Sequence, residues 1–374
     1  MSQTLLKAKT PILLLKMTKK SLFLEHKILL PKSDIKLSNI PQREVYYFML
    51  DFKNLCELLL PYLKRTVRRA MSEIVYFNDQ YVPLEEANLG IKTHAFLYGT
   101  SLFEGIRGYW LPEEKSISIF RLKEHYQRIL ANSRIFMMTP KDTLDDLIEQ
   151  TKEVIRRNAP KHDVYIRMTL YKTGVNIGPF LDKVETTHTI WTHPLGNYVN
   201  IDGLHVTVSS WRRVDDNAIP PCAKTGGSYM NTAVMITDAK RQGFDELISL
   251  TQDGHVSEGS AMNLFMVRKG KLVTPAITEN ILEGVTRDCI LTLAKNELGL
   301  EVEERQVNRT ELYRADELFF TGTAAQVAPI TKIDTRPVGS GQVGEITAAL
   351  QKIYFDVVKN KNLRYSDWCT VVPI

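Results

Sequence analysis

Residues 223–231, Ala-Lys-Thr-Gly-Gly-Ser-Tyr-Met-Asn, place one long amine among small side chains. Glycine lets the backbone approach a bound molecule closely, so Lys224 lies in a setting that suits a ligand. A lysine amine can also form an imine with a carbonyl compound. Most lysines are solvated surface charges, however, so this segment needs support from the rest of the chain.

Short strands and amphipathic helices alternate on both sides of this segment. The chain has 374 residues, of which 44% are hydrophobic, and such a length favours two packed domains over one. The sequence contains no internal repeat. Its length and its alternating strands and helices predict a two-domain α/β (α+β) protein with a cleft between the domains. Helices are expected at 122–135, 143–158, 229–242, 285–298 and 345–359, with hairpins turning at Asn78-Asp79 and Lys269-Gly270.

The strand expected at 164–171 separates two kinds of side chain. Its even-numbered residues are all apolar, so Tyr165, Arg167, Thr169 and Tyr171 share the opposite face. An arginine on such a face is more often a solvent-exposed residue than a ligand contact. A break at Pro194-Leu-Gly-Asn197 then separates a small α/β domain, 71–195, from a large domain, 205–374, with 196–204 as the linker.

The net charge of +5 belongs to the first 70 residues. They contain 14 Lys and Arg against 5 Asp and Glu, whereas the remaining residues carry 34 against 38. The main body therefore gives no reason to expect nucleic acid as a partner. Residues 1–70 are interpreted as a basic N-terminal extension, with Met71 as a candidate biological start. Their length and their five acidic residues argue against a targeting peptide.

Cysteine content and motifs exclude several classes of protein. Four scattered cysteines indicate neither a disulfide framework nor a zinc site, so no metal is expected. The absence of a disulfide framework favours a reducing, cytoplasmic location. The longest apolar run near the start, 11–15, is too short to span a membrane. The sequence lacks Gly-x-Gly-x-x-Gly, P-loop, His-Glu-x-x-His and Gly-x-Ser-x-Gly motifs.

Four further features are ambiguous when each is taken alone. Glu258 in Val-Ser-Glu-Gly is either a loop acid or a ligand contact, and Arg128 could form an exposed pair with Glu124 worth about 0.3 kcal/mol. The start of the helix at Gly284 suits a phosphate but equally an ordinary N-terminal cap. Residues 322–325, Gly-Thr-Ala-Ala, end a strand in small residues.

Taken together, these segments resemble one family. In order and spacing, they resemble the branched-chain amino acid aminotransferases, which are class IV pyridoxal-phosphate enzymes. The resemblance runs from about residue 74 to the mid-350s and leaves out residues 1–70. The segments that carry it are 98–107, 165–167, 223–231, 257–259, 284–288 and 322–325.

The resemblance implies pyridoxal 5′-phosphate in the interdomain cleft of a fold shared with D-amino-acid aminotransferases. Lys224 matches the residue that binds this cofactor as an imine and then moves the proton at the substrate's Cα. Glu258 matches the partner of the pyridine nitrogen, and Tyr229 matches the phenol beside the 3-oxygen. The phosphate contacts that match are Arg128, Val285, Thr286 and Thr323.

The same resemblance implies a pocket for two kinds of substrate. Thr323 and Ala324 offer backbone amides to the α-carboxylate, and Arg167 is the expected partner of glutamate's second carboxylate. The side-chain walls that match are Tyr98, Phe103, Tyr165 and Tyr198. Two residues depart from the common bacterial pattern: Leu195 where tryptophan is familiar, which leaves side-chain preference open, and Met262 where an acid is frequent.

The implied reaction transfers the amino group of L-leucine, L-isoleucine or L-valine to 2-oxoglutarate, reversibly, as in branched-chain amino acid biosynthesis. The implied partners are amino acids, 2-oxo acids and further copies of the chain in a homodimer or larger oligomer, with no nucleic acid and no membrane. Alternatives within the fold are a D-amino-acid aminotransferase and an aminodeoxychorismate lyase. A third is a non-catalytic binding protein that uses the basic N-terminal arm.

Overall fold

The computed structural model describes residues 72–196 and 199–374, together with the backbone of three short strands before them. These strands are β1 (Leu15–Thr18), β2 (Ser21–Leu24) and β3 (Tyr46–Phe48), which pair antiparallel in the order β2-β1-β3. They belong to one unit, Met1–Ser72, and the rest of the chain forms a second, Glu73–Ile374. The interpretation of residues 1–70 as an extension lies largely outside the described residues.

A seven-stranded antiparallel sheet, called here the first sheet, occupies the earlier part of the second unit. Its order is β18-β7-β6-β8-β9-β4-β5. The hairpin predicted at Asn78-Asp79 is confirmed, and both turn residues have the positive φ that a two-residue turn requires. The strands are β4 (Ile74–Phe77), β5 (Gln80–Pro83), β6 (Ser101–Leu111), β7 (Ser116–Phe120), β8 (Val164–Lys172), β9 (Thr186–Pro194) and β18 (Cys369–Pro373).

Two helices, α3 (Leu122–Ser133) and α4 (Leu144–Asn158), share a core with this sheet. Both were predicted, and α4 begins at a capping box in which the side chains of Thr143 and Asp146 bond each other's backbone amides. Alternation along β8 is also confirmed: Ile166 and Met168 are fully buried in this core. The opposite face of β8 is thereby left free for a site. A short helix, α2 (His94–Tyr98), precedes β6.

The later part of the unit contains a mixed eight-stranded sheet, called here the second sheet. Its order is β11-β10-β16-β15-β12-β13-β14, with β17 paired to β16. The strands are β10 (Leu204–Arg212), β11 (Glu246–Leu250), β12 (Asn263–Arg268), β13 (Lys271–Pro275), β14 (Val302–Arg305), β15 (Glu317–Gly322), β16 (Gln326–Ile333) and β17 (Arg336–Pro337). The helices are α5 (Tyr229–Arg241), α6 (Val285–Leu298) and α7 (Glu345–Val358).

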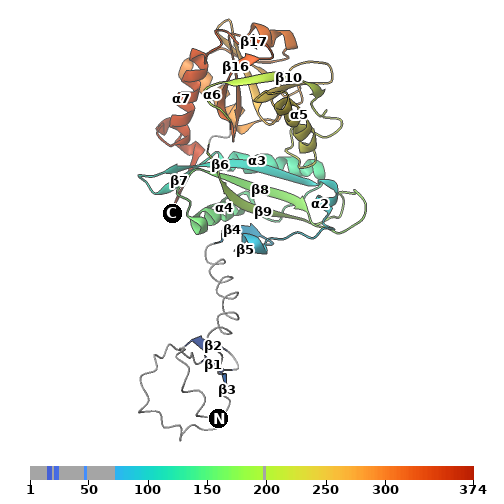
Figure 1. Ribbon diagram of the computed structural model, residues 1–374, viewed down its shortest axis with the longest axis vertical. Helices are drawn as coiled ribbons and strands as arrows, with labels where there is room; N and C mark the ends of the chain where they lie inside the picture. The colour runs from blue at the N-terminus through green and yellow to red at the C-terminus, as the bar shows by residue number, and fades with distance from the viewer. Residues whose placement is uncertain (1–14, 19–20, 25–45, 49–71, 197–198) are drawn as a thin grey trace, which may run out of the picture. The chain divides into compact units, whose positions relative to one another are not determined.

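Both faces of the second sheet are covered, which explains why its central strands are continuously buried. Side chains of β12 alternate between two cores: Leu264 and Met266 pack with β10, whereas Phe265 and Val267 pack with α6 and α7. Figure 1 shows α6 and α7 along one side of this sheet and α5 on the other.

One strand crosses the predicted domain boundary. The large domain was expected to run to residue 374, but β18 pairs with β7 in the first sheet, from Cys369 against Phe120 to Pro373 against Ser116. The physical reason is that β7 would otherwise be an unpaired edge. The last residues therefore belong with the first sheet, and the rest of the predicted domain division stays a prediction.

Candidate active site

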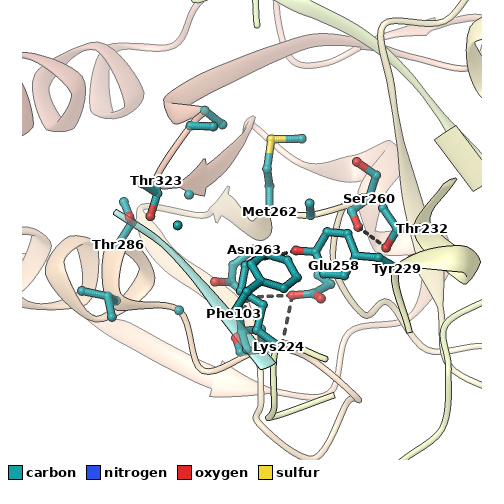
Figure 2. Close-up of a pocket in the computed structure, with 18 of the residues that line it drawn as sticks. Phe103, Lys224, Tyr229, Thr232, Glu258, Ser260, Met262, Asn263, Thr286 and Thr323 are labelled. Atoms are coloured by element: carbon teal, nitrogen blue, oxygen red, sulfur yellow. Dashed lines mark hydrogen bonds between the residues drawn. The ribbon is translucent and has the colours of Figure 1, made fainter. Parts of the chain in front are cut away.

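A cavity of about 470 Å³ is lined by residues from both sheets. β6 and β8 of the first sheet contribute Phe103 and Arg167, and the second sheet contributes the segments around Glu258 and Thr323. Figure 2 shows Lys224, Tyr229, Glu258 and Thr286 gathered around this space. The cavity therefore combines an amine, a phenol, a carboxylate and a helix N-terminus.

Lys224 is held by pairing of its segment with the start of β6. The Phe103 amide donates to the Lys224 carbonyl at 2.9 Å, and the Gly226 amide donates to the Ser101 carbonyl at 2.8 Å. A Cβ on Gly226 would lie 2.3 Å from Ser101 Oγ, so a larger residue there would force the Ser101 side chain to move. Lys224 Nζ then donates to the Tyr229 hydroxyl at 2.6 Å, at the start of α5.

Glu258 is a buried carboxylate with three partners. Arg213 Nη2 lies 2.6 Å from its Oε1, and its Oε2 accepts from Asn263 Nδ2 at 2.9 Å and from the Leu282 amide at 3.2 Å. Burial raises the pKa of Glu258, and the charge of Arg213 opposes that rise. The sequence analysis identified Glu258 but missed Arg213, because an ion pair across 45 residues leaves no local pattern.

The N-terminus of α6 faces the cavity through Val285 and Thr286. Gly284 precedes the helix and offers no side chain to accept from its first amides. A Cβ at Gly284 would lie 2.0 Å from Asn263 Oδ1, so the helix start approaches the Glu258 network as only glycine allows. Thr323, in the turn between β15 and β16, lines the same part of the cavity.

Arg128 does not form the exposed pair with Glu124 that was one reading of the sequence. It holds the buried carboxylate of Glu104 through Nε at 2.8 Å and Nη2 at 2.6 Å, and it donates to the Glu283 carbonyl at 2.7 Å. Glu124 pairs with Arg121 instead. Arg128 therefore lies at the cavity wall beside α6, with a carboxylate behind it.

Phe103, Tyr165 and Arg167 form the wall that the first sheet contributes. Arg167 Nη1 donates to the Tyr165 hydroxyl at 2.9 Å, and its guanidinium carbon lies 3.4 Å from the centre of the Phe103 ring. Gly105 makes room for this wall, because a Cβ there would lie 2.4 Å from the Tyr165 hydroxyl. One cation thus lies among aromatic surfaces.

A second buried arginine, Arg107, was not predicted. Its guanidinium donates to the backbone carbonyls of Leu195, just before the linker, and of Gly196, its first residue, at 3.2 and 2.9 Å, and to the Ala324 carbonyl at 3.3 Å. Arg107 thereby ties the linker to the turn that carries Thr323 and Ala324. Both turn residues line the cavity.

The remaining predicted residues have different outcomes. Leu195 and Met262 both line the cavity. Tyr98 does not: its side chain is 37% exposed, and its hydroxyl accepts from the Gly178 amide at 2.9 Å. Tyr198 lies outside the described residues.

Comparison with known proteins identifies the family. The model of the amino-transferase class IV family matches residues 101–333. The chain is 44% identical over 301 residues, 80% of this chain and 97% of the other, to a probable branched-chain-amino-acid aminotransferase of Aquifex aeolicus. The chain therefore belongs to the branched-chain aminotransferases of class IV.

Solved structures agree with this assignment. A branched-chain amino acid aminotransferase from Thermobaculum terrenum, in its PLP form, is 37% identical with a TM-score of 0.78, covering 81% of this chain and 99% of that one. The T.th. enzyme, complexed with N-(5′-phosphopyridoxyl)-L-glutamate, is also 37% identical, with a TM-score of 0.76, covering 80% and 98%. The chain has the class IV fold of mixed α/β type with two sheets.

Enzymes of this class depend on pyridoxal phosphate, and the residues present fit that group. The cavity offers an amine for an aldehyde, a carboxylate for a basic ring nitrogen, and a helix N-terminus with hydroxyls and a cation for a phosphate. The buried Thr321 hydroxyl, which has no partner, also lines it.

Two kinds of feature are absent from the part of the chain that the structure describes. Over residues 72–196 and 199–374 and the three short strands, no three His, Cys, Asp or Glu side chains are grouped so as to hold a metal. In those same residues, none of the helices has the length and hydropathy that crossing a bilayer requires.

Proposed function

We propose that the protein transfers the amino group of L-leucine, L-isoleucine or L-valine to 2-oxoglutarate, reversibly, with Lys224 as its catalytic residue. The observation that carries this is the contact of the Lys224 amine with Tyr229 in a cavity that also holds the buried Glu258. Family membership supports the substrate class. The structural relative bound to a phosphopyridoxyl-glutamate supports glutamate as the second substrate.

Pyridoxal phosphate, when bound, supplies an electron-withdrawing ring that acidifies the substrate's Cα–H bond. In the proposal Lys224 would hold the cofactor through Nζ, and the amine, released when the substrate's amino group takes its place, would remove and return the proton at Cα. Glu258, whose carboxylate is held by Arg213, would keep the ring nitrogen protonated, because a carboxylate stabilises a positive charge beside it. Tyr229 donates a hydrogen bond to the 3-oxygen. Arg128, Val285, Thr286 and Thr323 bind the phosphate.

The proposed substrate site uses the turn and the wall on either side. The amides of Thr323 and Ala324 bind the α-carboxylate, and Phe103 and Tyr165 contact an apolar side chain. Arg167 binds the distal carboxylate of glutamate when that substrate replaces leucine. Its position over Phe103 supports this dual use, because the aromatic ring offers apolar surface and the cation offers charge.

We also propose that the protein works as a homodimer or larger oligomer, in the cytoplasm and in branched-chain amino acid biosynthesis. Tyr98 belongs to an apolar face made of α2 and the loop 173–185. Gly178 of the loop holds the two segments together through hydrogen bonds with Tyr98 and His94 of α2. Its exposed side chains include Phe96 at 70%, Phe180 at 78% and Ile177 at 96%. A patch of this kind is typical of an interface, and a second copy would bury Tyr98.

The test is a purified-protein assay that follows glutamate and 2-oxo acid formation. L-Leucine with 2-oxoglutarate should give both products, whereas D-alanine with 2-oxoglutarate should give neither, and aminodeoxychorismate should release no pyruvate. Turnover of D-alanine or of aminodeoxychorismate without turnover of L-leucine would overturn the proposal. Absence of every activity, with retained salt-sensitive binding of nucleic acid, would favour a binding protein instead.

A further inference from the structure

Three side chains beside the cavity form one buried cluster that the proposed chemistry uses only in part. Glu104 lies on β6 and is 1% exposed, and His125 lies on α3 and is 2% exposed. Arg128, one helical turn after His125, holds both oxygens of Glu104. His125 Nδ1 lies 2.7 Å from Glu104 Oε2, so the carboxylate joins the imidazole and the guanidinium.

The cluster has a front and a back with respect to the cavity. Phe103 and Gly105 line the cavity from β6, while Glu104, between them, points to the other face of the strand, where α3 packs. His125 and Arg128 both line the cavity. A bound anion would therefore meet the imidazole and the guanidinium, with the carboxylate behind them.

The cluster carries no net charge in the ligand-free protein. Burial alone would raise the pKa of Glu104, but Arg128 and His125 lower it to about 2, so Glu104 is an anion at neutral pH. This anion compensates the charge of Arg128. Burial lowers the pKa of His125 against the opposing effect of Glu104, which leaves the imidazole neutral.

The hydrogen bond to Glu104 fixes the tautomer of His125. An ionised carboxylate can only accept, so Nδ1 of the ring donates and Nε2 of the neutral ring carries a lone pair. The phosphate of the cofactor is close to a dianion at neutral pH, because its second pKa is about 6. A lone pair near such a dianion is unfavourable, whereas an N–H would be a hydrogen-bond donor.

We propose that His125 takes up a proton when the phosphate end of the cofactor binds, while Glu104 holds the imidazole ring in place. The neutral cluster thereby becomes a positively charged binding site for the phosphate anion. The inference rests on the proposed function, which assigns Arg128 to the phosphate. The proton comes from solvent and binds to Nε2. His125 is therefore a further cofactor-binding residue, and Glu104 is a positioning residue for both of its partners.

The charged groups that face His125 come from three elements. Glu104 belongs to β6, Arg128 to its own helix, and Lys224 to the segment before α5. Glu104 and Arg128 keep their charges across neutral pH. The pKa of His125 is low in the free protein and higher in the complex, so affinity falls as pH rises between these two values, by at most about tenfold per pH unit.

The experiment is calorimetric titration of the cofactor-free protein with pyridoxamine 5′-phosphate, in buffers of different ionisation enthalpy. This probe carries the phosphate but no aldehyde, so it forms no bond with Lys224. Near neutral pH the wild type should take up about one proton more per bound ligand than His125→Asn or His125→Gln. Pyridoxamine, which lacks the phosphate, should show no such difference between the proteins.

The control is His162→Asn, which removes an exposed imidazole and should match the wild type. Equal proton uptake by wild type and both His125 variants would overturn the inference while leaving the proposed function intact. Failure of the wild type to bind the probe would overturn both. If neither His125 variant folds, equal proton uptake by the wild type with pyridoxamine and with its phosphate would overturn the inference.

Discussion

The two halves of the cavity differ in how deeply their lining side chains are buried within the chain. On the side of the second sheet, Glu258 and its partners Arg213 and Asn263 are buried and mutually hydrogen-bonded. On the side of the first sheet, Phe103 is buried but Tyr165 and Arg167 are only partly buried, and Tyr98 lies outside the cavity. The carboxylate network proposed for the cofactor is thus closed off by the chain itself, whereas two of the three wall residues proposed for substrates stay partly exposed.

This difference indicates which part of the cavity is rigid. Buried charges must be paired, so the polar network around Glu258 fixes the geometry there. The substrate half must instead accept either an apolar or an acidic side chain, which suits a wall in which Tyr165 and Arg167 are partly exposed. Changes in the first half should therefore act on the reaction itself, and changes in the second on substrate choice and assembly.

The largest effect is expected for Lys224→Ala. Loss of both the cofactor-binding amine and the proton carrier should lower turnover of L-leucine with 2-oxoglutarate by about 10⁴-fold or more. Steady-state rates of the two proteins measure this. Lys123→Ala, which removes an exposed lysine of α3, is the control and should keep wild-type activity. A loss of less than tenfold in Lys224→Ala would contradict the assignment.

Arg213→Met should lower turnover near neutral pH by about 10²-fold and move the acid limb of the pH profile upward. Burial already raises the pKa of Glu258 and Arg213 opposes this, so its removal raises that pKa further. A larger fraction of the carboxyl is then protonated and ionises only as pH increases, so activity should partly recover toward alkaline pH. A pH–rate profile checks the sign.

The double variant Glu258→Gln/Arg213→Met is the matched control for that profile. It lacks the titrating carboxyl, so its low activity should show no alkaline recovery. An acid limb that stays at the wild-type pH in Arg213→Met would show that Arg213 does not tune Glu258.

Arg167→Gln should separate the two substrates of the substrate half. A lost charge-assisted hydrogen bond should raise KM for 2-oxoglutarate by about 10- to 100-fold, and KM for L-leucine by less than about threefold. Arg156→Gln, on the exposed surface of α4, is the control and should change neither constant. Equal increases in KM for both substrates would contradict a role of Arg167 in binding the distal carboxylate.

The smallest effect on activity is expected for Ile177→Asp on the apolar face. A charge at this nearly fully exposed position should weaken self-association, and activity at low protein concentration should fall by about three- to tenfold. Sedimentation velocity measures the assembly state directly. Leu363→Asp, at another exposed apolar side chain, should leave assembly unchanged. An Ile177→Asp protein that sediments as the wild type would remove this face as an interface.

Local sequence patterns predicted the secondary-structure elements that depend on neighbouring residues. The alternation of β8, the helices α3 and α4 and the turn at Asn78-Asp79 all follow from periodicity and turn chemistry. The segments around Lys224, Glu258 and Gly284 were ambiguous from their residues alone, and it was the resemblance to the branched-chain aminotransferases that implied one site. The structure places all three at one cavity.

Long-range partners could not be predicted in the same way. Arg213 with Glu258, Arg128 with Glu104, and the pairing of β18 with β7 join residues distant in sequence. Nothing in the segment around Arg128 separates a buried pair with β6 from an exposed pair with Glu124. Tyr98 likewise contacts Gly178, 80 residues later in the chain, and no local pattern specifies that contact.

The central claim is that the Lys224 amine is the covalent attachment point of pyridoxal phosphate. Borohydride reduction of the cofactor-loaded protein, followed by proteolysis and peptide mass spectrometry, tests it most directly. The account predicts that the reduced cofactor is found on the peptide containing Lys224, and that prior addition of L-leucine alone removes this label. Label on a different lysine, or equal labelling with and without L-leucine, would contradict the account.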